Sequence, residues 1–162
     1  MPPNPDEAVD AGFRLRDEPG HLLRLCQQRA VDLFVQEVGE EGPTPRQFAV
    51  LVSVMAKPGL SQTDLVRATG IDRSTLTEII RRLVRRGLVS RRRTAADQRA
   101  NALQLTDAGA AAVAKATPAV LRAQARIMAP VPPARRADAM ALLALLAGPD
   151  DAADQPAGKT MP

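Results

Sequence analysis

Aromatic side chains are scarce in this chain of 162 residues, which contains three Phe and neither Trp nor Tyr. Proteins that hold single-stranded nucleic acid stack successive bases on aromatic faces, so this composition argues against a stacking platform for single strands. Apolar residues still make up 45% of the sequence. That fraction indicates a globular body, and the length favours one domain, with or without additional helices.

The chain also has only one Cys and one His. An intramolecular disulfide framework is therefore excluded. We expect no metal site, because zinc needs several such ligands, and no cofactor. One Cys and no signal segment are typical of a reducing cytoplasm, where we expect the protein to be. The longest nearly apolar stretch, Met140 to Ala147, is far shorter than the roughly 20 residues that span a bilayer, so we expect no membrane partner.

Charge is distributed unevenly along the sequence. The net charge of +4 comes from 22 basic and 18 acidic residues, and 19 of the basic residues are Arg. From Arg67 to Arg99, ten Arg stand against three acidic residues, which gives this segment +7 and leaves −3 for the rest of the chain. A basic segment in an acidic body suggests a polyanion as partner. The alternatives are a solvated basic face and the Arg, Ala and Pro bias of a G+C-rich genome.

Apolar residues on two faces predict a helix from His21 to Val38. Such a helix is buried on two sides, so one side can meet its own domain and the other a second subunit. One face holds Leu23, Ala30 and Phe34, and the other holds Leu22, Leu25 and Leu33.

Capping signals delimit three further helices. Thr44 to Gln47 forms a capping box with Pro at the first helical position, which starts a helix that ends near Ala56. Thr106 caps a long Ala-rich helix with a kink at Pro118, and Pro132-Pro133 starts a last helix.

Two short helices joined through Thr69-Gly70-Ile71 form a helix-turn-helix candidate. Ser61 to Asp64 begins the first helix, and Asp72 caps the second, which Gly87 stops. The second helix of such a unit enters the major groove, where short polar and Arg side chains pair with base edges. The residues assigned to bases or adjacent phosphates are Arg73, Ser74, Thr75 and Thr77, with Arg81 as a phosphate contact; Glu78 and Arg85 also lie outside the apolar stripe.

A change from helical to alternating spacing predicts a β-hairpin with a charged tip. Leu88-Val89 leads into it, Thr94 to Gln98 form the turn, and Asn101 to Leu105 return. Arg99 is expected to enter the narrow minor groove, held by a bidentate pair with Asp97. Three further arginines line the approach to the phosphates: Arg91, Arg92 and Arg93.

From Thr44 to Gly109 the sequence resembles the MarR (multiple antibiotic resistance regulator) family of winged helix-turn-helix transcription factors. The residues that carry the resemblance are Thr44 to Leu51, Leu60 to Leu65, Ile71 to Thr77, Arg82 to Val89, Asp97 to Arg99 and Leu105 to Gly109. Each piece alone is weak, whereas their order and spacing together are specific, and with the flanking helices the similarity covers roughly residues 20–147. The resemblance implies a mainly α fold with a small β-hairpin wing, in which the N- and C-terminal helices form a dimerisation domain.

The expected organisation follows from this resemblance and from the Pro, Gly and mixed charge of both ends. It comprises a flexible N-terminal tail (1–18), a helical dimerisation region (19–42 and 107–147), a winged helix-turn-helix DNA-binding lobe (43–106) and a flexible C-terminal tail (148–162). The resemblance also implies an obligate homodimer on a near-palindromic operator of double-stranded DNA, with its two recognition helices in successive major grooves. Members of the family are usually repressors that a ligand releases.

In this family the ligand cleft lies between the dimer helices and the DNA-binding lobe. Gly20 to Arg24 and the Gln-rich turn that follows resemble a branch that controls the catabolism of aromatic acids. The resemblance therefore implies a small aromatic carboxylate as effector, or its acyl-coenzyme A thioester, whose phosphates Arg side chains can pair. The candidate contacts are Phe34, Phe48 and Met55 as apolar walls, which also suit an ordinary core, and His21, Arg24 and Arg29 as polar anchors.

Cys26 suggests a different trigger. Relatives that sense peroxide carry a reactive Cys on the first helix, and a thiolate needs nearby cations, which Arg24 and Arg29 supply. Those relatives also use a Tyr, which this chain lacks. A sequence-indifferent architectural DNA binder is a second alternative. We do not expect an enzyme, because a P-loop, a Rossmann glycine signature and a Ser-His-Asp set with spare members are missing.

Overall fold

The computed structural model describes residues 14–94 and 97–148, and the side chains of residues 92–101 lie outside the description. The elements in chain order are the 3₁₀ turn η1 (Leu15–Asp17), α2 (Pro19–Val38), α3 (Pro45–Ala56), α4 (Gln62–Thr69), α5 (Arg73–Arg85), β1 (Val89–Thr94), β2 (Asp97–Leu105), α6 (Asp107–Met128), the 3₁₀ turn η2 (Pro133–Arg135) and α7 (Arg136–Ala147). The predicted class, mainly α with a small antiparallel hairpin, is confirmed.

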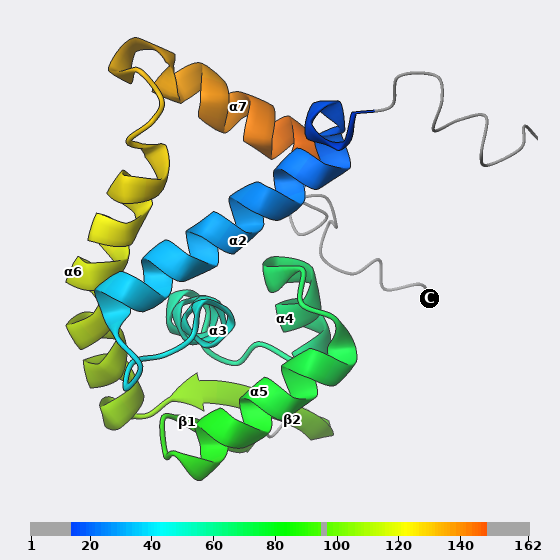
Figure 1. Ribbon diagram of the computed structural model, residues 1–162. Helices are drawn as coiled ribbons and strands as arrows, with labels where there is room; N and C mark the ends of the chain where they lie inside the picture. Colours follow the sequence, from blue (N-terminus) through cyan, green and yellow to red (C-terminus); the bar gives the residue numbers. More distant parts are fainter. Residues whose placement is uncertain (1–13, 95–96, 149–162) are drawn as a thin grey trace, which may run out of the picture.

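Figure 1 shows two parts of the molecule. In one part α3, α4, α5 and the hairpin gather into a lobe. In the other, α2 and α6 run away from the lobe, and α7 folds back from the far end of α6 toward the N-terminal end of α2. The lobe is therefore carried by two helices that are far apart in sequence.

The hydrophobic core lies in the lobe and draws on all of its helices. Its largest fully buried side chains are Val50, Leu51, Val54, Leu65, Leu76, Ile80 and Leu83. Val89 of β1, Leu103 of β2 and Val113 of α6 complete the same cluster. Burial of one such side chain stabilises a fold by about 1.5–3 kcal/mol, so the elements of the lobe hold one another in place.

Local capping sets the helix boundaries of the lobe as the sequence predicts. The backbone N–H of Gln47 donates to Thr44 Oγ1 while the N–H of Thr44 donates to Gln47 Oε1, both at 3.2 Å. Ser61 and Asp64 make the same capping box at the start of α4. Gly70 ends α4 with φ at 64°, a left-handed conformation that favours glycine.

The hairpin is longer and its turn shorter than the sequence indicates. β1 continues to Thr94, which pairs with Asp97, so the strands leave only residues 95 and 96 between them instead of the turn predicted from Thr94 to Gln98. That prediction was wrong because strands pair through backbone N–H and C=O groups. Charged side chains therefore do not prevent the strand from continuing.

A short bridge fastens the hairpin to the lobe. The N–H of Gly59 donates to the carbonyl of Leu103 at 2.9 Å, and the N–H of Leu103 donates to the carbonyl of Leu60 at 3.2 Å. Leu60 and Leu103 are also both buried. The base of the wing is therefore fixed by backbone hydrogen bonds and by the core together.

The C-terminal helices differ from the prediction in one detail. The last helix starts at Arg136, because Pro133 belongs to the preceding turn η2 and proline rings suit a turn better than a helix interior. α6 continues without a break across Pro118 to Met128, and the kink at Pro118 stays a prediction.

Within residues 14–94 and 97–148, the buried side chains of α2 lie near its C-terminal end. Leu33 and Phe34 are buried. Three apolar side chains of the N-terminal half are 41–46% exposed: Leu22, Leu23 and Leu25. The burial predicted on two faces is therefore incomplete in a single chain.

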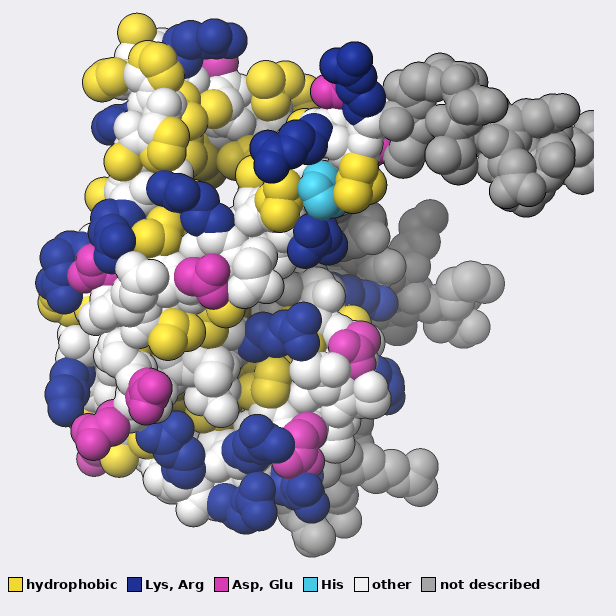
Figure 2. Space-filling view, in the orientation of Figure 1, with side chains coloured by type: hydrophobic (Ala, Val, Ile, Leu, Met, Phe, Trp, Pro, Cys, Tyr) yellow, Lys and Arg dark blue, Asp and Glu magenta, His cyan; other side chains and the backbone are white. Residues whose placement is uncertain are grey.

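α7 is apolar and exposed along its length. Its large side chains are 42–77% exposed: Met140, Leu142, Leu143, Leu145 and Leu146. In the space-filling view, apolar side chains gather around α7 and the adjoining ends of α2 and α6 (Figure 2). Apolar patches of this kind mark surfaces that bind another protein.

Hydrogen bonds join the start of α6 to Gly87 and Leu88, which follow α5. Thr106 Oγ1 donates to the carbonyl of Gly87 at 2.6 Å, and the N–H of Thr106 donates to the carbonyl of Leu88 at 3.2 Å. Gly109 is buried beside these residues, and a Cβ at this position would collide with the Leu88 carbonyl oxygen, just before β1, and with Leu105 at the end of β2. The absence of a side chain therefore lets α6 touch the backbone at the base of the wing.

We predict that Gly109→Ala lowers the free energy of unfolding by about 1–3 kcal/mol, the usual cost of overpacking. Urea denaturation followed by circular dichroism measures this change. Gly20→Ala is the matched control, because nothing lies within 4 Å of a Cβ there. Equal urea midpoints for Gly109→Ala and the wild type would contradict the close approach of α6 to Leu88.

Candidate nucleic-acid interface

α5 has one buried side and one exposed side, as its sequence predicts. Leu76, Ile79, Ile80 and Leu83 are buried. The opposite side is polar, and its side chains belong to the segment from Arg67 to Arg99, whose net charge is +7. Of the residues assigned to DNA from sequence, Arg73, Ser74, Thr77 and Arg81 are exposed and Thr75 is half-buried.

Asp72 fixes the N-terminus of α5. Its Oδ1 accepts the Ser74 hydroxyl at 2.6 Å and the Thr75 N–H at 2.9 Å. Both hydrogen bonds favour the ionised carboxylate, and the one from Ser74 contributes most to holding the pKa of Asp72 well below its usual range. Ser74 and Thr75 are thereby held at the first turn, the part of a recognition helix that usually reaches bases.

Polar contacts tie α5 to α4. Arg73 Nη2 donates to Thr63 Oγ1 at 3.0 Å, and Gln62 Nε2 donates to Thr77 Oγ1. The Thr77 hydroxyl donates in turn to the carbonyl of Arg73 at 2.7 Å. Two of the residues assigned to DNA are therefore held by the preceding helix, and the sequence gives no sign of these contacts between helices.

Glu78 lies among the arginines of α5. Its two carboxylate oxygens contact Arg81 Nη2 at 2.7 Å and Arg82 Nε at 2.9 Å. The hydrogen bond from Arg82 is the main reason that the pKa of Glu78 is lowered. The positive charge of this face is thus partly offset at its centre.

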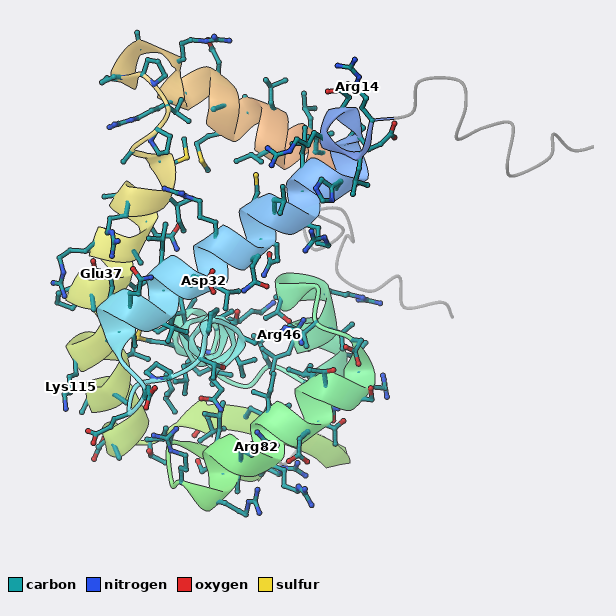
Figure 3. The ribbon with its side chains drawn as sticks, viewed as in Figure 1. Arg14, Asp32, Glu37, Arg46, Arg82 and Lys115 are labelled. Carbon is teal, nitrogen blue, oxygen red and sulfur yellow. The ribbon has the colours of Figure 1, made fainter. Side chains whose placement is uncertain are left out.

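A hollow of about 460 Å³ separates the start of α3 from the exposed side of α5. Its walls include Arg46 from α3 and Glu78 and Arg82 from α5, and Figure 3 labels Arg46 and Arg82 on their helices. In the sequence, Arg46 stands out only as part of a capping motif. Its place on this surface arises from tertiary packing, so a pattern within one helix does not reveal it.

The wing follows α5 directly, and its backbone register pairs Arg93 with Asn101 and Arg91 with Leu103. Arg91 is exposed. The side chains of Arg92, Arg93, Asp97 and Arg99 lie outside the described residues, so their assigned contacts stay predictions.

The six ligand candidates do not come together in one place. Phe34 and Phe48 pack edge to face, with ring centroids 6.2 Å apart at 60°, whereas Met55 is 48% exposed. Arg24 and Arg29 are exposed on α2 and His21 is half-buried. Thirteen residues of helix place His21 roughly 20 Å along the axis from Phe34, too far for one small acid to touch both.

A separate cavity of about 330 Å³ lies between the end of α2, α3 and the first half of α6. Apolar walls from these helices and from Leu88 surround it, and the charged side chains that line it are Glu41, Arg86 and Lys115. None of the six ligand candidates contributes to this lining.

Cys26 is exposed on α2. Within residues 14–94 and 97–148, no group of three or more His, Cys, Asp or Glu side chains is placed to hold a metal ion. No helix in the same ranges is long and apolar enough to cross a membrane.

Comparison with known proteins identifies relatives of this chain. Residues 41–100 match the family model described as MarR family. The transcriptional regulator PcaV from Streptomyces coelicolor, solved with its natural ligand, is 36% identical, with 85% of this chain and 96% of that chain covered and a TM-score of 0.79.

Two other solved regulators resemble the chain over most of its length. Bordetella bronchiseptica BpsR, whose DNA binding is regulated by 6-hydroxynicotinic acid, is 30% identical, with 86% of this chain and 99% of that chain covered and a TM-score of 0.81. The transcriptional repressor CouR, solved with p-coumaroyl-CoA, is 31% identical, with coverages of 83% and 94% and a TM-score of 0.75. CouR has also been solved on a 23-mer DNA duplex.

We predict that Asp72 makes the stability of the protein depend on pH. The pKa of this carboxyl is lower in the folded protein than in the unfolded chain, where an Asp has a pKa of about 3.9. Its ionised form therefore stabilises the folded state at pH values above about 3.9, and this stabilisation is lost as the pH falls further. Asp72→Asn keeps a capping oxygen but carries no charge. We expect a lower Tm than wild type at pH 7, and a difference that shrinks below about pH 4.

Thermal denaturation followed by circular dichroism from pH 7 to pH 2 measures the two curves. Asp17→Asn, at an exposed position in η1, removes the same charge away from the lobe. A Tm difference between Asp72→Asn and wild type that stays constant across the whole range would contradict the role given to the Asp72 carboxylate.

Proposed function

Since the chain belongs to the MarR family of transcriptional regulators, we propose that it is a ligand-responsive repressor. In this proposal it binds a palindromic operator in double-stranded DNA, and a small aromatic acid, or the coenzyme A thioester of one, releases it. The alternatives are a repressor that Cys26 switches by oxidation and an architectural protein that binds any duplex.

The observation that carries the DNA-binding role is the two-sided character of α5. Its apolar stripe is buried in the core while its basic and hydroxyl side chains are exposed, and the major groove admits one α-helix. In the proposal, Arg73, Ser74, Thr75 and Thr77 contact bases or adjacent phosphates. The phosphate contacts are Arg81 and Arg91, with Arg93 beside them, and Arg99 enters the minor groove next to Asp97.

The exposed apolar surface supports a dimer. α7 and the N-terminal half of α2 leave large apolar side chains exposed, and a second copy of the chain provides an equally apolar surface to cover them. We therefore assign residues 19–42 and 107–147 to dimerisation and residues 43–106 to DNA binding. Two lobes related by a two-fold axis fit half-sites about 34 Å apart, one turn of the duplex.

The path from ligand to DNA runs through α2 and α6 in this proposal. Glu37 of α2 pairs with Arg122 and Arg126 of α6, each at 2.9 Å. The other end of α6 is fastened to Leu88 at the base of the wing. A ligand that shifts α2 relative to α6 therefore changes the angle at which the lobe is held.

The relatives suggest the class of effector. BpsR responds to 6-hydroxynicotinic acid and CouR binds p-coumaroyl-CoA, so one is an aromatic acid and the other the thioester of an aromatic acid. We propose that Phe34, Phe48 and Met55 form the apolar side of the site and that Arg29 contributes charge. Because His21 and Arg24 lie roughly 20 Å and 15 Å from Phe34 along α2, we propose that the partner chain supplies these two.

Selection from a pool of random duplexes tests the function and identifies the operator in the same experiment. The full chain is expected to enrich one short palindrome. A thermal-shift screen of aromatic acids and their coenzyme A thioesters then finds ligands, and each hit is tested for release of the selected duplex. Enrichment of no sequence would favour the architectural alternative. Release by peroxide that Cys26→Ser abolishes would favour the redox alternative.

The wing assignment predicts that Arg99→Ala weakens binding to the selected duplex more than tenfold. One phosphate neutralised by a side chain changes the slope of log affinity against log salt by about −0.9, so the slope should flatten by a similar amount. Fluorescence anisotropy at several salt concentrations measures both effects. Arg16→Ala, at an exposed position in η1, removes the same charge outside the lobe and the dimerisation region and should leave both unchanged. Unchanged affinity for Arg99→Ala would overturn the wing assignment.

The dimer assignment predicts that Leu145→Glu, at a side chain 77% exposed in the single chain, converts the protein to a monomer. A charge buried in an apolar interface is costly, so sedimentation velocity should show half the mass and DNA binding should weaken. Ala68→Glu introduces the same charge at an exposed position on α4, away from α7, and should remain dimeric. A Leu145→Glu protein that sediments as a dimer would place the interface elsewhere.

A further inference from the structure

A carboxylate occupies the middle of the exposed side of α5. Ser74, Glu78, Arg81 and Arg85 follow one another at spacings of four, three and four residues, which places them on one face of a helix. That face is opposite the buried stripe of Leu76, Ile80 and Leu83. A duplex that meets α5 through this face therefore meets Glu78 as well as the arginines.

In the structure, Glu78 engages two arginines of α5 at once. Arg81 contacts one oxygen of the carboxylate at 2.7 Å and Arg82 the other at 2.9 Å. The side chains of Arg81 and Arg82 are 62% and 57% exposed and that of Glu78 is 37% exposed, so all three remain within reach of a partner. Pairs at such exposure contribute little to stability, which leaves the presence of an acid at this position unexplained by folding.

A carboxylate at this position opposes phosphate contacts, whatever the base sequence. Non-specific binding depends on the neutralisation of phosphates by Lys and Arg, and here two arginines already have a counter-charge. Their charge is already partly neutralised, and the carboxylate itself faces the negative duplex. Glu78 therefore weakens the phosphate contacts that bind the protein to DNA of any sequence.

The same carboxylate distinguishes between bases. An ionised carboxylate only accepts hydrogen bonds, whereas guanine offers acceptors to the major groove and thymine an acceptor and a methyl group. Cytosine offers its N4 amino group, the donor that Glu side chains use in base recognition. Adenine also offers an amino donor, but its N7 acceptor lies beside that donor and repels a carboxylate, so cytosine suits Glu78 best of the four bases.

We propose that Glu78 is a specificity-determining residue, which accepts a hydrogen bond from the amino group of one cytosine in each half-site and disfavours binding to other sequences. This inference rests on the proposed function, because it requires α5 to lie in the major groove. It assigns a role to the one acidic side chain on this face of α5, which neither capping nor core packing accounts for.

Glu78→Gln tests the proposal, because glutamine keeps the length of the side chain and removes its charge. Gln pairs with adenine rather than cytosine. In selection from random duplexes, the variant should replace cytosine by adenine at one position of each half-site and keep the other positions. Its affinity for a random duplex should rise at least fivefold, while its affinity for the duplex selected by wild type rises less or falls.

Glu40→Gln is the matched control. Glu40 is exposed between α2 and α3, so the substitution makes the same change in net charge away from α5 and should leave the selected sequence as in wild type. An identical selected sequence for Glu78→Gln and wild type, or an equal gain of random-duplex affinity in both variants, would overturn the role of Glu78. Enrichment of no sequence by wild type would overturn the proposed function instead, and this inference with it.

Discussion

Burial of the apolar stripe of α5 is the constraint on which the lobe depends. Leu76, Ile80 and Leu83 are inaccessible to solvent or nearly so, and they meet side chains from α3, α4, the hairpin and the start of α6. Burial on one side of a helix dictates which side remains outside. The exposure of Arg73, Ser74 and Arg81 is therefore a consequence of core packing, and a surface for DNA is made by the same helix that stabilises the fold.

Local signals in the sequence were sufficient to predict most element boundaries. The capping boxes at Thr44 and Ser61 and the cap at Asp72 are each made within four residues, so a pattern of neighbouring residues identifies them. Periodicity likewise predicted which side of α5 is buried. The turn of the hairpin was predicted poorly, because the pairing of Thr94 with Asp97 depends on backbone groups that side-chain patterns do not report.

Contacts between elements could not be predicted in the same way. Gln62 contacts Thr77 and Thr63 contacts Arg73 only because α4 and α5 cross at a particular angle. Arg46 joins the same surface through the packing of α3. The ligand candidates were taken from the position of the family's cleft, which indicates helices but not distances along them. His21 and Phe34 were therefore placed together, although a long stretch of α2 separates them.

The pairing of Glu37 with Arg122 has a consequence for synthesis of the chain. The two residues are 85 positions apart, and ribosomes add about 5–20 residues per second. α2 therefore waits for roughly 4–17 s before the part of α6 that covers it has been made. During that interval its apolar side chains are open to chaperones or to another nascent chain, whereas the lobe, made of consecutive segments, can fold as soon as the start of α6 has emerged.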